Sequence, residues 1–371
     1  MKRILPLVLA ALALPAGAAA LDTSAFAKTV EFAVTGYAGS SALENFPVLV
    51  RLAADSPAGF DYADCAADGS DLRFADADGN LIPHEIDTWN AAGESFVWVR
   101  VPSLANGAAF SMYFGSDAPG AAAADDVWSR YAVVVHGGSS AANAVSGGPA
   151  VTIGNATYVK TEADAGKVGG GFRKSAGNAV AVNVAMGNPA ASLADTGKFS
   201  VSGWFKRNGN GGSSGNGTHV LAASRPGWSS GTGFLLLQEK GQYIDVAANN
   251  SHQWSSGNYT LANQTWGHVA FAYESGVSLT SWFDGVQDNR KTSDIGNLVS
   301  SGGIWTFGSY ANTGSNDSFI GDMDELRIFD GVASGDWIKA EHDSVANASF
   351  LAYGEVRDNG SSTPAMTVFF F

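Results

Sequence analysis

The segment at residues 319–329 constrains the fold most. It reads FIGDMDELRIF, so apolar residues are threaded among acids. The apolar members are Met323, Leu326, Ile328 and Phe329, and the acids are Asp322, Asp324 and Glu325. Such interleaving over about ten residues is typical of a β-strand. The segment therefore predicts a long strand in a large β-sandwich.

Composition favours an all-β chain. The sequence has 46 glycines and 11% aromatic residues, while only 15% of residues are charged. Many turns and few apolar stripes of helical period are expected from this balance. The length of 371 residues suggests two domains. A run of small residues at 118–124 marks the composition shift between them.

The first block, residues 21–117, alternates as short strands do. Val30, Phe32 and Val34 share one face of a predicted strand, and a second predicted strand carries Val97, Val99 and Val101. Turn signals such as Asn106-Gly107 separate the strands. We expect a small antiparallel β-sandwich, followed by a linker at 118–126.

The second block, residues 127–356, has longer predicted strands. They lie at 199–205, 233–238, 242–246, 266–273 and 279–285. A short helix is expected at 334–345, with Trp337 and Ile338 buried. Residues 207–217 are predicted to form a loop. Residues 357–371 are predicted to form a tail, which ends in three phenylalanines.

Four motifs of the first block resemble a bacterial domain-of-unknown-function family, number 2341. They are NFPVLVRL at 45–52, DGSDLRFAD at 68–76, HEIDTW at 84–89 and VWVRVP at 97–102. Their order over about 90 residues carries the resemblance. It implies no established activity, but the family is often found beside laminin-G-like domains on secreted and surface proteins.

The second block resembles laminin-G-like, concanavalin A-like jelly rolls. The resemblance rests on WGHVAFAY at 266–273, LTSWFDG at 279–285 and the strand at 319–329. It implies a jelly-roll sandwich used outside cells, mostly to hold glycans or proteins and sometimes to cut glycans. The fold class expected for the whole chain is a small antiparallel sandwich followed by this jelly roll.

The first twenty residues predict export. Lys2 and Arg3 precede an apolar stretch at 4–14, and Ala18, Ala19 and Ala20 form a small-residue cleavage site. No later stretch is apolar enough to span a membrane. We expect an extracellular, cell-surface or periplasmic protein.

The formal charge of −14 argues against nucleic acid as a partner. The chain has a single cysteine, Cys65, so no internal disulfide can form. Cys65 is predicted to be a small core residue.

No catalytic residues are predicted. Glu85 and Asp87 resemble part of the Glu-x-Asp-x-x-Glu strand of laminarinase-type glucanases, but Asn90 stands at the sixth position. A retaining glycosidase needs two carboxylates about 5 Å apart. Glu85 and Asp87 are therefore interpreted as structural residues of their own motif. In the second block, His136, His219, His252 and His268 lack the spacing of metal ligands.

Glycan binding needs exposed aromatic rings beside planar polar groups. The candidates are Trp228, Tyr243, His252, Trp254, Tyr310, Asn312, Asn316 and Asp317. The jelly-roll resemblance also implies a structural Ca²⁺ ion with Asp324 as a ligand.

The leading prediction is a non-catalytic protein that binds a polysaccharide or surface glycan. Two alternatives stay open. One is a hydrolase or lyase that uses an unrecognised acid pair among Glu239, Asp245 and Asp317. The other is a structural or adhesive component whose partner is another surface protein.

Overall fold

The computed structural model describes most of the chain from residue 19 to residue 359. The residues left out within that span are 124–125, 139–140, 158, 176–180, 187–196, 210–216, 241–242, 250, 255–258, 300–302 and 312–316. Most of the expected signal peptide, most of the loop at 207–217 and the end of the expected tail lie outside the described residues. No described helix is long and apolar enough to cross a membrane.

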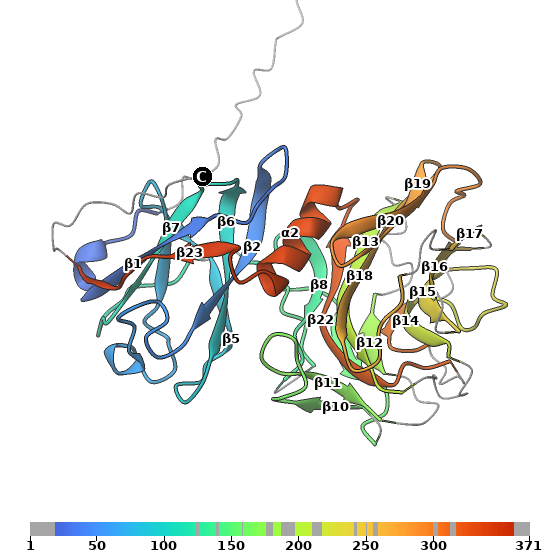
Figure 1. Ribbon diagram of the computed structural model, residues 1–371, viewed down its shortest axis with the longest axis horizontal. Helices are drawn as coiled ribbons and strands as arrows, with labels where there is room; N and C mark the ends of the chain where they lie inside the picture. The colour runs from blue at the N-terminus through green and yellow to red at the C-terminus, as the bar shows by residue number, and fades with distance from the viewer. Residues whose placement is uncertain are drawn as a thin grey trace, which may run out of the picture.

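The first sandwich consists of two antiparallel sheets (Figure 1). One sheet has the order β23-β1-β7-β3-β4, and β24 also pairs with β1. Its strands are β1 (Lys28–Val34), β3 (Arg73–Asp76), β4 (Leu81–Ile82), β7 (Ala109–Phe114), β23 (Leu351–Tyr353) and β24 (Arg357–Asp358). The other sheet, β2-β6-β5, contains β2 (Leu43–Leu52), β5 (His84–Thr88) and β6 (Ser95–Leu104). Two short 3-10 helices complete this part, η1 (Thr23–Ala25) and η2 (Tyr62–Asp64).

Alternation of side chains explains why the first sandwich forms. Val30, Phe32 and Val34 of β1 are fully buried, as are Val97 and Val99 of β6. Period-2 geometry directs these side chains into the layer between the two sheets. The predicted small antiparallel sandwich is confirmed.

The chain returns to the first sandwich after completing the second. Phe32 pairs with Tyr353 and Lys28 pairs with Asp358, so β23 and β24 extend the edge beside β1. Residues 351–356 were predicted to belong to the jelly roll and residues 357–358 to the tail, and both predictions are wrong. These strands are too short to show a period, and only the distant strand β1 gives them a sheet to join.

The second sandwich also has two antiparallel sheets. The eight-stranded sheet has the order β10-β11-β22-β13-β18-β19-β20, with β8 also paired to β22. Its strands are β8 (Tyr131–Val135), β10 (Val159–Glu162), β11 (Gly171–Lys174), β13 (Lys198–Arg207), β18 (Trp266–Glu274), β19 (Ser278–Phe283), β20 (Val286–Lys291) and β22 (Gly321–Asp330). The predicted closing strand is β22, which lies between β11 and β13.

The seven-stranded sheet has the order β17-β16-β15-β14-β21-β12-β9. Its strands are β9 (Ala150–Ile153), β12 (Val182–Ala185), β14 (His219–Ala223), β15 (Phe234–Glu239), β16 (Tyr243–Ala248), β17 (Ser251–Trp254) and β21 (Ile304–Phe307). The predicted all-β fold class, a small sandwich followed by a jelly roll, is confirmed.

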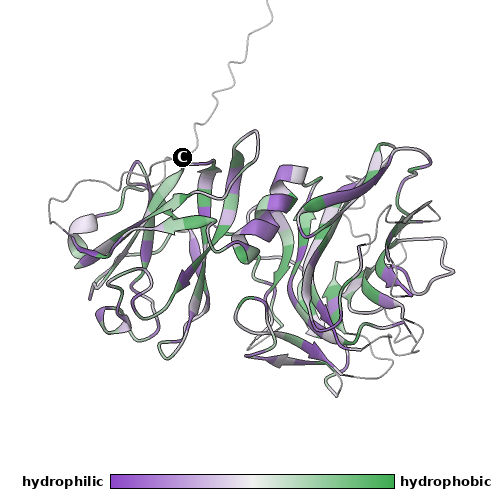
Figure 2. Ribbon diagram, viewed as in Figure 1, coloured by the Kyte–Doolittle hydropathy of each residue, from purple (hydrophilic) through white to green (hydrophobic). Residues whose placement is uncertain are grey.

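Helix α2 (Gly335–Ala346) lies between the two sandwiches (Figure 1). Ser334 caps it by accepting a hydrogen bond from the Trp337 backbone N–H at 3.1 Å. Trp337 and Ile338 are buried, as predicted. Figure 2 shows both hydrophobic and hydrophilic residues on this helix. Trp337 belongs to a hydrophobic core that includes residues of both sandwiches, so the domains share one packed interior.

Candidate functional site

The outer face of the seven-stranded sheet points away from the first sandwich (Figure 1). Alternation along β15 separates the two faces of this sheet. Phe234 and Leu236 join the core between the jelly-roll sheets, whereas Leu235 and Leu237 form a second cluster on the opposite face. The outer face of the other jelly-roll sheet contributes Trp204 and Trp282 to the core shared with the first sandwich. The seven-stranded sheet therefore carries the jelly-roll face that the first domain does not cover.

A buried guanidinium lies at this outer face. Arg225 follows β14 and is fully buried. Its Nη2 donates to the carbonyl oxygens of Gly233 and Asn249, at 3.3 and 2.5 Å. Among the residues that the structure describes, its Nε and Nη1 have no hydrogen-bond partner. Burial lowers the pKa of Arg225, but Asp245 and Tyr310 act to raise it.

Tyr310 lies in the same cluster as Leu235 and Leu237. Only 1% of its surface is exposed, and its hydroxyl finds no partner within the described part of the chain. Burial raises the pKa of Tyr310, and the nearby carboxylates Asp317, Glu239 and Asp245 add to that shift. Buried polar atoms are usually hydrogen-bonded, so the unpartnered atoms of Arg225 and Tyr310 are unusual features of this sheet face.

Three further glycan candidates lie on described parts of the second sandwich. Trp228 is 42% exposed in the loop that Arg225 begins. Tyr243 begins β16 and is half-buried, and Asp317 is half-buried with its carbonyl oxygen 2.8 Å from the Val220 backbone nitrogen. The expectation of an exposed ring at Tyr310 is wrong, because apolar side chains of β14 to β16 enclose it.

The other glycan candidates are less fully described. The backbones of His252 and Trp254 lie in β17, which pairs with β16, but their side chains lie outside the described residues. Asn312 and Asn316 lie outside them entirely. Arg225 was not predicted as a site residue. The sequence signal for it is a charged residue two positions after the end of the buried strand β14.

A second cluster of charged residues lies at the domain junction. Glu85 and Asp87 of β5 face the jelly roll, and the Trp128 indole N–H donates to Glu85. The Asp87 side chain is only 6% exposed. Burial raises the pKa of Asp87 to about 6, although His136 opposes the shift. Both acids of the HEIDTW motif are thus engaged between the domains.

His136 joins the two domains. Its Nδ1 lies 2.7 Å from Glu325 Oε1 and 3.9 Å from Asp87 Oδ2, and its Nε2 lies 3.8 Å from Glu85 Oε1. Burial acts to lower the pKa of His136, but Glu325 and Asp87 outweigh it and raise the pKa well above its usual value. Asp87, His136 and Glu325 are a set of three possible metal ligands in the described chain.

A β-bulge directs the acids of β22 toward the junction. The register between β13 and β22 shifts opposite Gly203, and Glu325 has a φ of 51°. Met323 and Leu326 therefore both enter the jelly-roll core, while Glu325 turns toward His136. A bulge re-aims side chains in this way, and a non-glycine residue with positive φ is often found at functional positions.

Arg327 is the central cation of the junction. It donates to Glu325 at 2.5 Å and to Glu341 of α2 at 3.0 Å. Its guanidinium carbon lies 4.7 Å and 4.9 Å from the ring centres of Trp98 and Trp128. Burial acts to lower the pKa of Arg327, but Glu325 and Glu341 outweigh it and raise the pKa. Cation–π contacts with desolvated rings add to this charge pairing.

Asp324, the predicted calcium ligand, is fully buried beside this cluster. Its Oδ2 accepts from the backbone nitrogens of Lys167 and Val168 at 2.7 and 2.8 Å, and its Oδ1 accepts from the Glu325 nitrogen at 2.8 Å. Asp324 thereby anchors the segment before β11. Calcium binding by this residue stays a prediction.

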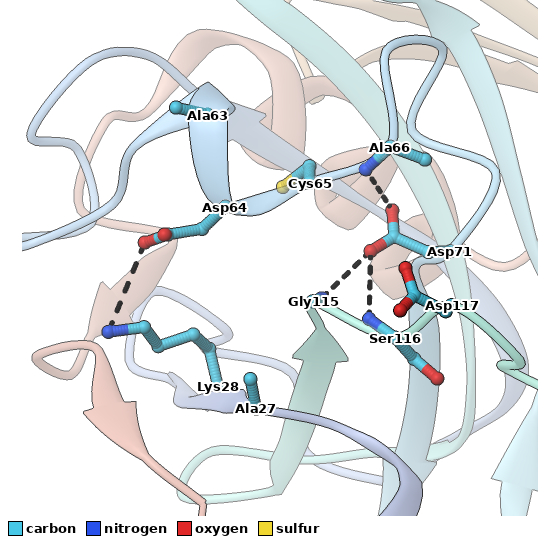
Figure 3. A pocket seen from close by; sticks show the side chains of 10 residues that line it. All are labelled: Ala27, Lys28, Ala63, Asp64, Cys65, Ala66, Asp71, Gly115, Ser116 and Asp117. Atoms are coloured by element: carbon cyan, nitrogen blue, oxygen red, sulfur yellow. Dashed lines mark hydrogen bonds and ion pairs between the residues drawn. The ribbon is translucent and has the colours of Figure 1, made fainter.

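The first sandwich contains a cavity of about 340 Å³ near η2 (Figure 3). Asp71 lies in its wall and accepts from the backbone nitrogens of Ala66 and Gly115, each at 2.8 Å. Burial raises the pKa of the Cys65 thiol to about 12. A thiol that stays protonated is a poor nucleophile, which agrees with a packing role for Cys65.

Two protein families match the chain in the order that the sequence predicted. Residues 68–131 match a domain of unknown function, DUF2341. Residues 175–339 match the concanavalin A-like lectin/glucanases superfamily. Both resemblances drawn from the sequence motifs are confirmed, and the second sandwich is a concanavalin A-like jelly roll. No curated protein matched the chain.

Several solved structures resemble part of the chain. The binding domain of Paraclostridial mosquitocidal protein 1 is 11% identical, with a TM-score of 0.47 over 59% of this chain and 53% of that one. The receptor binding domain of botulinum neurotoxin D is 14% identical, with a TM-score of 0.46 over 58% and 52%. The binding domain of botulinum neurotoxin DC in complex with SialylT is 14% identical, with a TM-score of 0.45 over 59% and 52%. The chain thus spans about half the length of these structures.

Proposed function

We propose that this protein is exported and binds a polysaccharide or surface glycan, without catalysis, on the outer face of its seven-stranded sheet. The observation that carries the proposal is that Arg225 and Tyr310 lie near each other, with Trp228 in the loop that follows Arg225. Two buried polar side chains have unpartnered donors within the described chain, and an exposed ring lies in the same loop as one of them. Sugars present both hydroxyls and apolar C–H faces, so they need both kinds of group.

The domain junction supports the non-catalytic part of the proposal. Glycoside hydrolysis needs two carboxylates that reach the substrate. In the sequence, Glu85 and Asp87 were the strongest candidates for such a catalytic pair. In the structure they lie between the domains, where Trp128 donates a hydrogen bond to Glu85 and His136 lies at ion-pair distance from Asp87. The sequence match is to a superfamily of both lectins and glucanases, and a fold does not decide between them.

The hydrolase or lyase alternative has one observation in its favour. Glu239, Asp245 and Asp317 all act on the pKa of Tyr310, so these three carboxyl groups gather at the proposed binding face. An acid pair among them would cut the glycan that the face holds. The experiment must therefore follow products as well as binding.

A glycan array with the mature chain from Leu21 onward tests the proposal. We expect binding to one class of glycan and no release of reducing ends or unsaturated products during long incubation. The array is run with calcium and again with a chelator, because calcium dependence is part of the expectation from Asp324. Failure to bind any glycan under both conditions would contradict the proposal and favour a protein partner. Product release that Asp317→Asn abolishes would favour an enzyme.

A further inference from the structure

Three side chains from two domains meet at the junction with the geometry of a metal-binding set. Asp87 comes from β5 of the first sandwich, His136 follows β8, and Glu325 lies in the bulge of β22. One possible ligand atom from each lies within 4.8 Å of the others. The His136 Nδ1 distances of 2.7 Å to Glu325 and 3.9 Å to Asp87 lie on either side of the spacing of about 3.4 Å between tetrahedral ligands of a zinc ion.

The local charges favour a cation at this point. Four carboxyl groups, those of Asp87, Asp324, Glu325 and Glu341, are each at most 6% exposed. Within the described chain, Arg327 is the arginine or lysine side chain at ion-pair distance from these carboxyl groups, and it pairs with Glu325 and Glu341. One permanent cation beside four buried carboxyl groups leaves room for further positive charge, because uncompensated buried charge is costly in a low-dielectric interior.

One unpartnered atom lies at the same place. In the part of the chain that the structure describes, Asp87 Oδ2 is buried without a hydrogen-bond partner. His136 is only 8% exposed, and the rings of Trp98 and Trp128 lie 6.2 Å and 5.3 Å from its ring centre. Native proteins rarely leave such groups unsatisfied unless an ion, a water or a ligand binds there.

We propose that Asp87, His136 and Glu325 bind one divalent transition-metal ion, with Zn²⁺ the best fit, across the domain junction. An imidazole nitrogen with two carboxylates suits Zn²⁺, whereas Ca²⁺ takes six to eight oxygen ligands. Glu85 lies on the Nε2 side of the imidazole and would accept its N–H while Nδ1 binds the metal.

Such an ion would stabilise the contact between the domains. It would add positive charge beside the buried carboxyl groups, and its ligands would join β5 of one sandwich to β22 of the other. A ligand that binds only the folded state stabilises it by mass action. This site is separate from the proposed glycan face, so each proposal can fail without the other.

Metal binding is measured on the full mature chain without a histidine tag, after treatment with a chelator. We expect one Zn²⁺ per chain after gel filtration, measured by elemental mass spectrometry, and a higher Tm with Zn²⁺ than with Ca²⁺. Cobalt added in place of zinc should give visible d–d absorption from the imidazole and carboxylate ligands.

Asp87→Asn removes one ligand at nearly constant volume and should weaken zinc binding at least tenfold. Glu341→Gln is the matched control, because it removes a buried carboxylate of the same network that is not a proposed ligand. It should keep stoichiometric binding. Circular dichroism checks that both variants fold. Absence of stoichiometric zinc in the wild type, or equal affinity in Asp87→Asn and wild type, would overturn the proposal.

Discussion

Arg327 shows how one side chain organises the contact between the domains. It contacts carboxylates from β22 and α2, and aromatic rings from β6 and the segment before β8. The sequence motif around it suggested a strand, and that prediction is confirmed. The partners of Arg327 come from positions more than 200 residues apart, so no local pattern could reveal them.

Replacing Arg327 with methionine should destabilise the protein strongly. The substitution leaves Glu325 and Glu341 buried without their main cation, and breaking a buried pair in this way costs about 3–5 kcal/mol. Chemical denaturation followed by fluorescence measures the change in the free energy of unfolding. Arg290→Met, at an exposed arginine of β20, should change it by less than about 0.5 kcal/mol. A similar small effect for both variants would contradict the central role of Arg327.

His219 should make the fold sensitive to acid. It is fully buried in β14, and burial, with help from Arg207 and Lys174, lowers the pKa of His219 to about 4. Its contribution to stability is therefore fully present above the unfolded pKa of about 6.5, and is lost as the pH falls through about 4. The loss between these values is about 3 kcal/mol.

His219→Leu removes this titration and should flatten the pH dependence of the unfolding free energy between pH 6.5 and 4. The measurement is a series of denaturation curves at constant ionic strength. A slope that is unchanged in the variant would show that His219 does not titrate as its burial requires.

Helix α2 is the element that joins the sandwiches. The Trp337 ring centre lies 4.9 Å from the ring centres of both Phe46 in β2 and Phe329 in β22. Its indole N–H also donates to the Tyr131 hydroxyl at 3.0 Å. One side chain thereby packs against strands of both domains.

Trp337→Ala should lower the free energy of unfolding by about 3–5 kcal/mol, because the substitution leaves a large cavity in the shared core. Differential scanning calorimetry should show a lower Tm for the whole chain. The control is Val332→Ala, at a residue that is 39% exposed just before the helix. If Trp337→Ala behaved like this control, α2 would not join the domains energetically.

Elements with strong periodicity could be predicted from the sequence. The strands expected at 199–205 and 266–273 lie within β13 and β18, and the helix expected at 334–345 matches α2 closely. Strands β23 and β24 could not be predicted in this way. They have three and two residues, and they exist because β1 supplies hydrogen-bonding groups more than 300 residues away.

The bulge of β22 also could not be predicted from the sequence. Strict alternation would place Asp324 and Glu325 on opposite faces of the sheet. The shift in register against β13 places Glu325 toward His136 and leaves Leu326 in the core. The sequence pattern identified the acids, but only the pairing with β13 shows which way they point.

At the scale of the whole molecule, the two sandwiches form successive layers around a shared core. The eight-stranded sheet packs against the seven-stranded sheet on one side, and against α2 and the first sandwich on the other. The first sandwich does not cover the outer face of the seven-stranded sheet, where Leu235, Leu237 and Tyr310 form a buried cluster. Asp324, which was predicted as a calcium ligand, lies in the eight-stranded sheet and therefore away from that face.

The affinity of the Trp228→Ala variant for the glycan identified on the array tests the central claim most directly. Calorimetric titration should show at least a tenfold weaker Kd, which corresponds to about 1.4 kcal/mol of lost binding free energy. The matched control is Tyr259→Ala, at an aromatic residue of the same domain that is 36% exposed and stacks on Phe283. The account predicts that this control binds as the wild type does. Equal affinity in the wild type and Trp228→Ala would show that the glycan binds elsewhere and would contradict the claim.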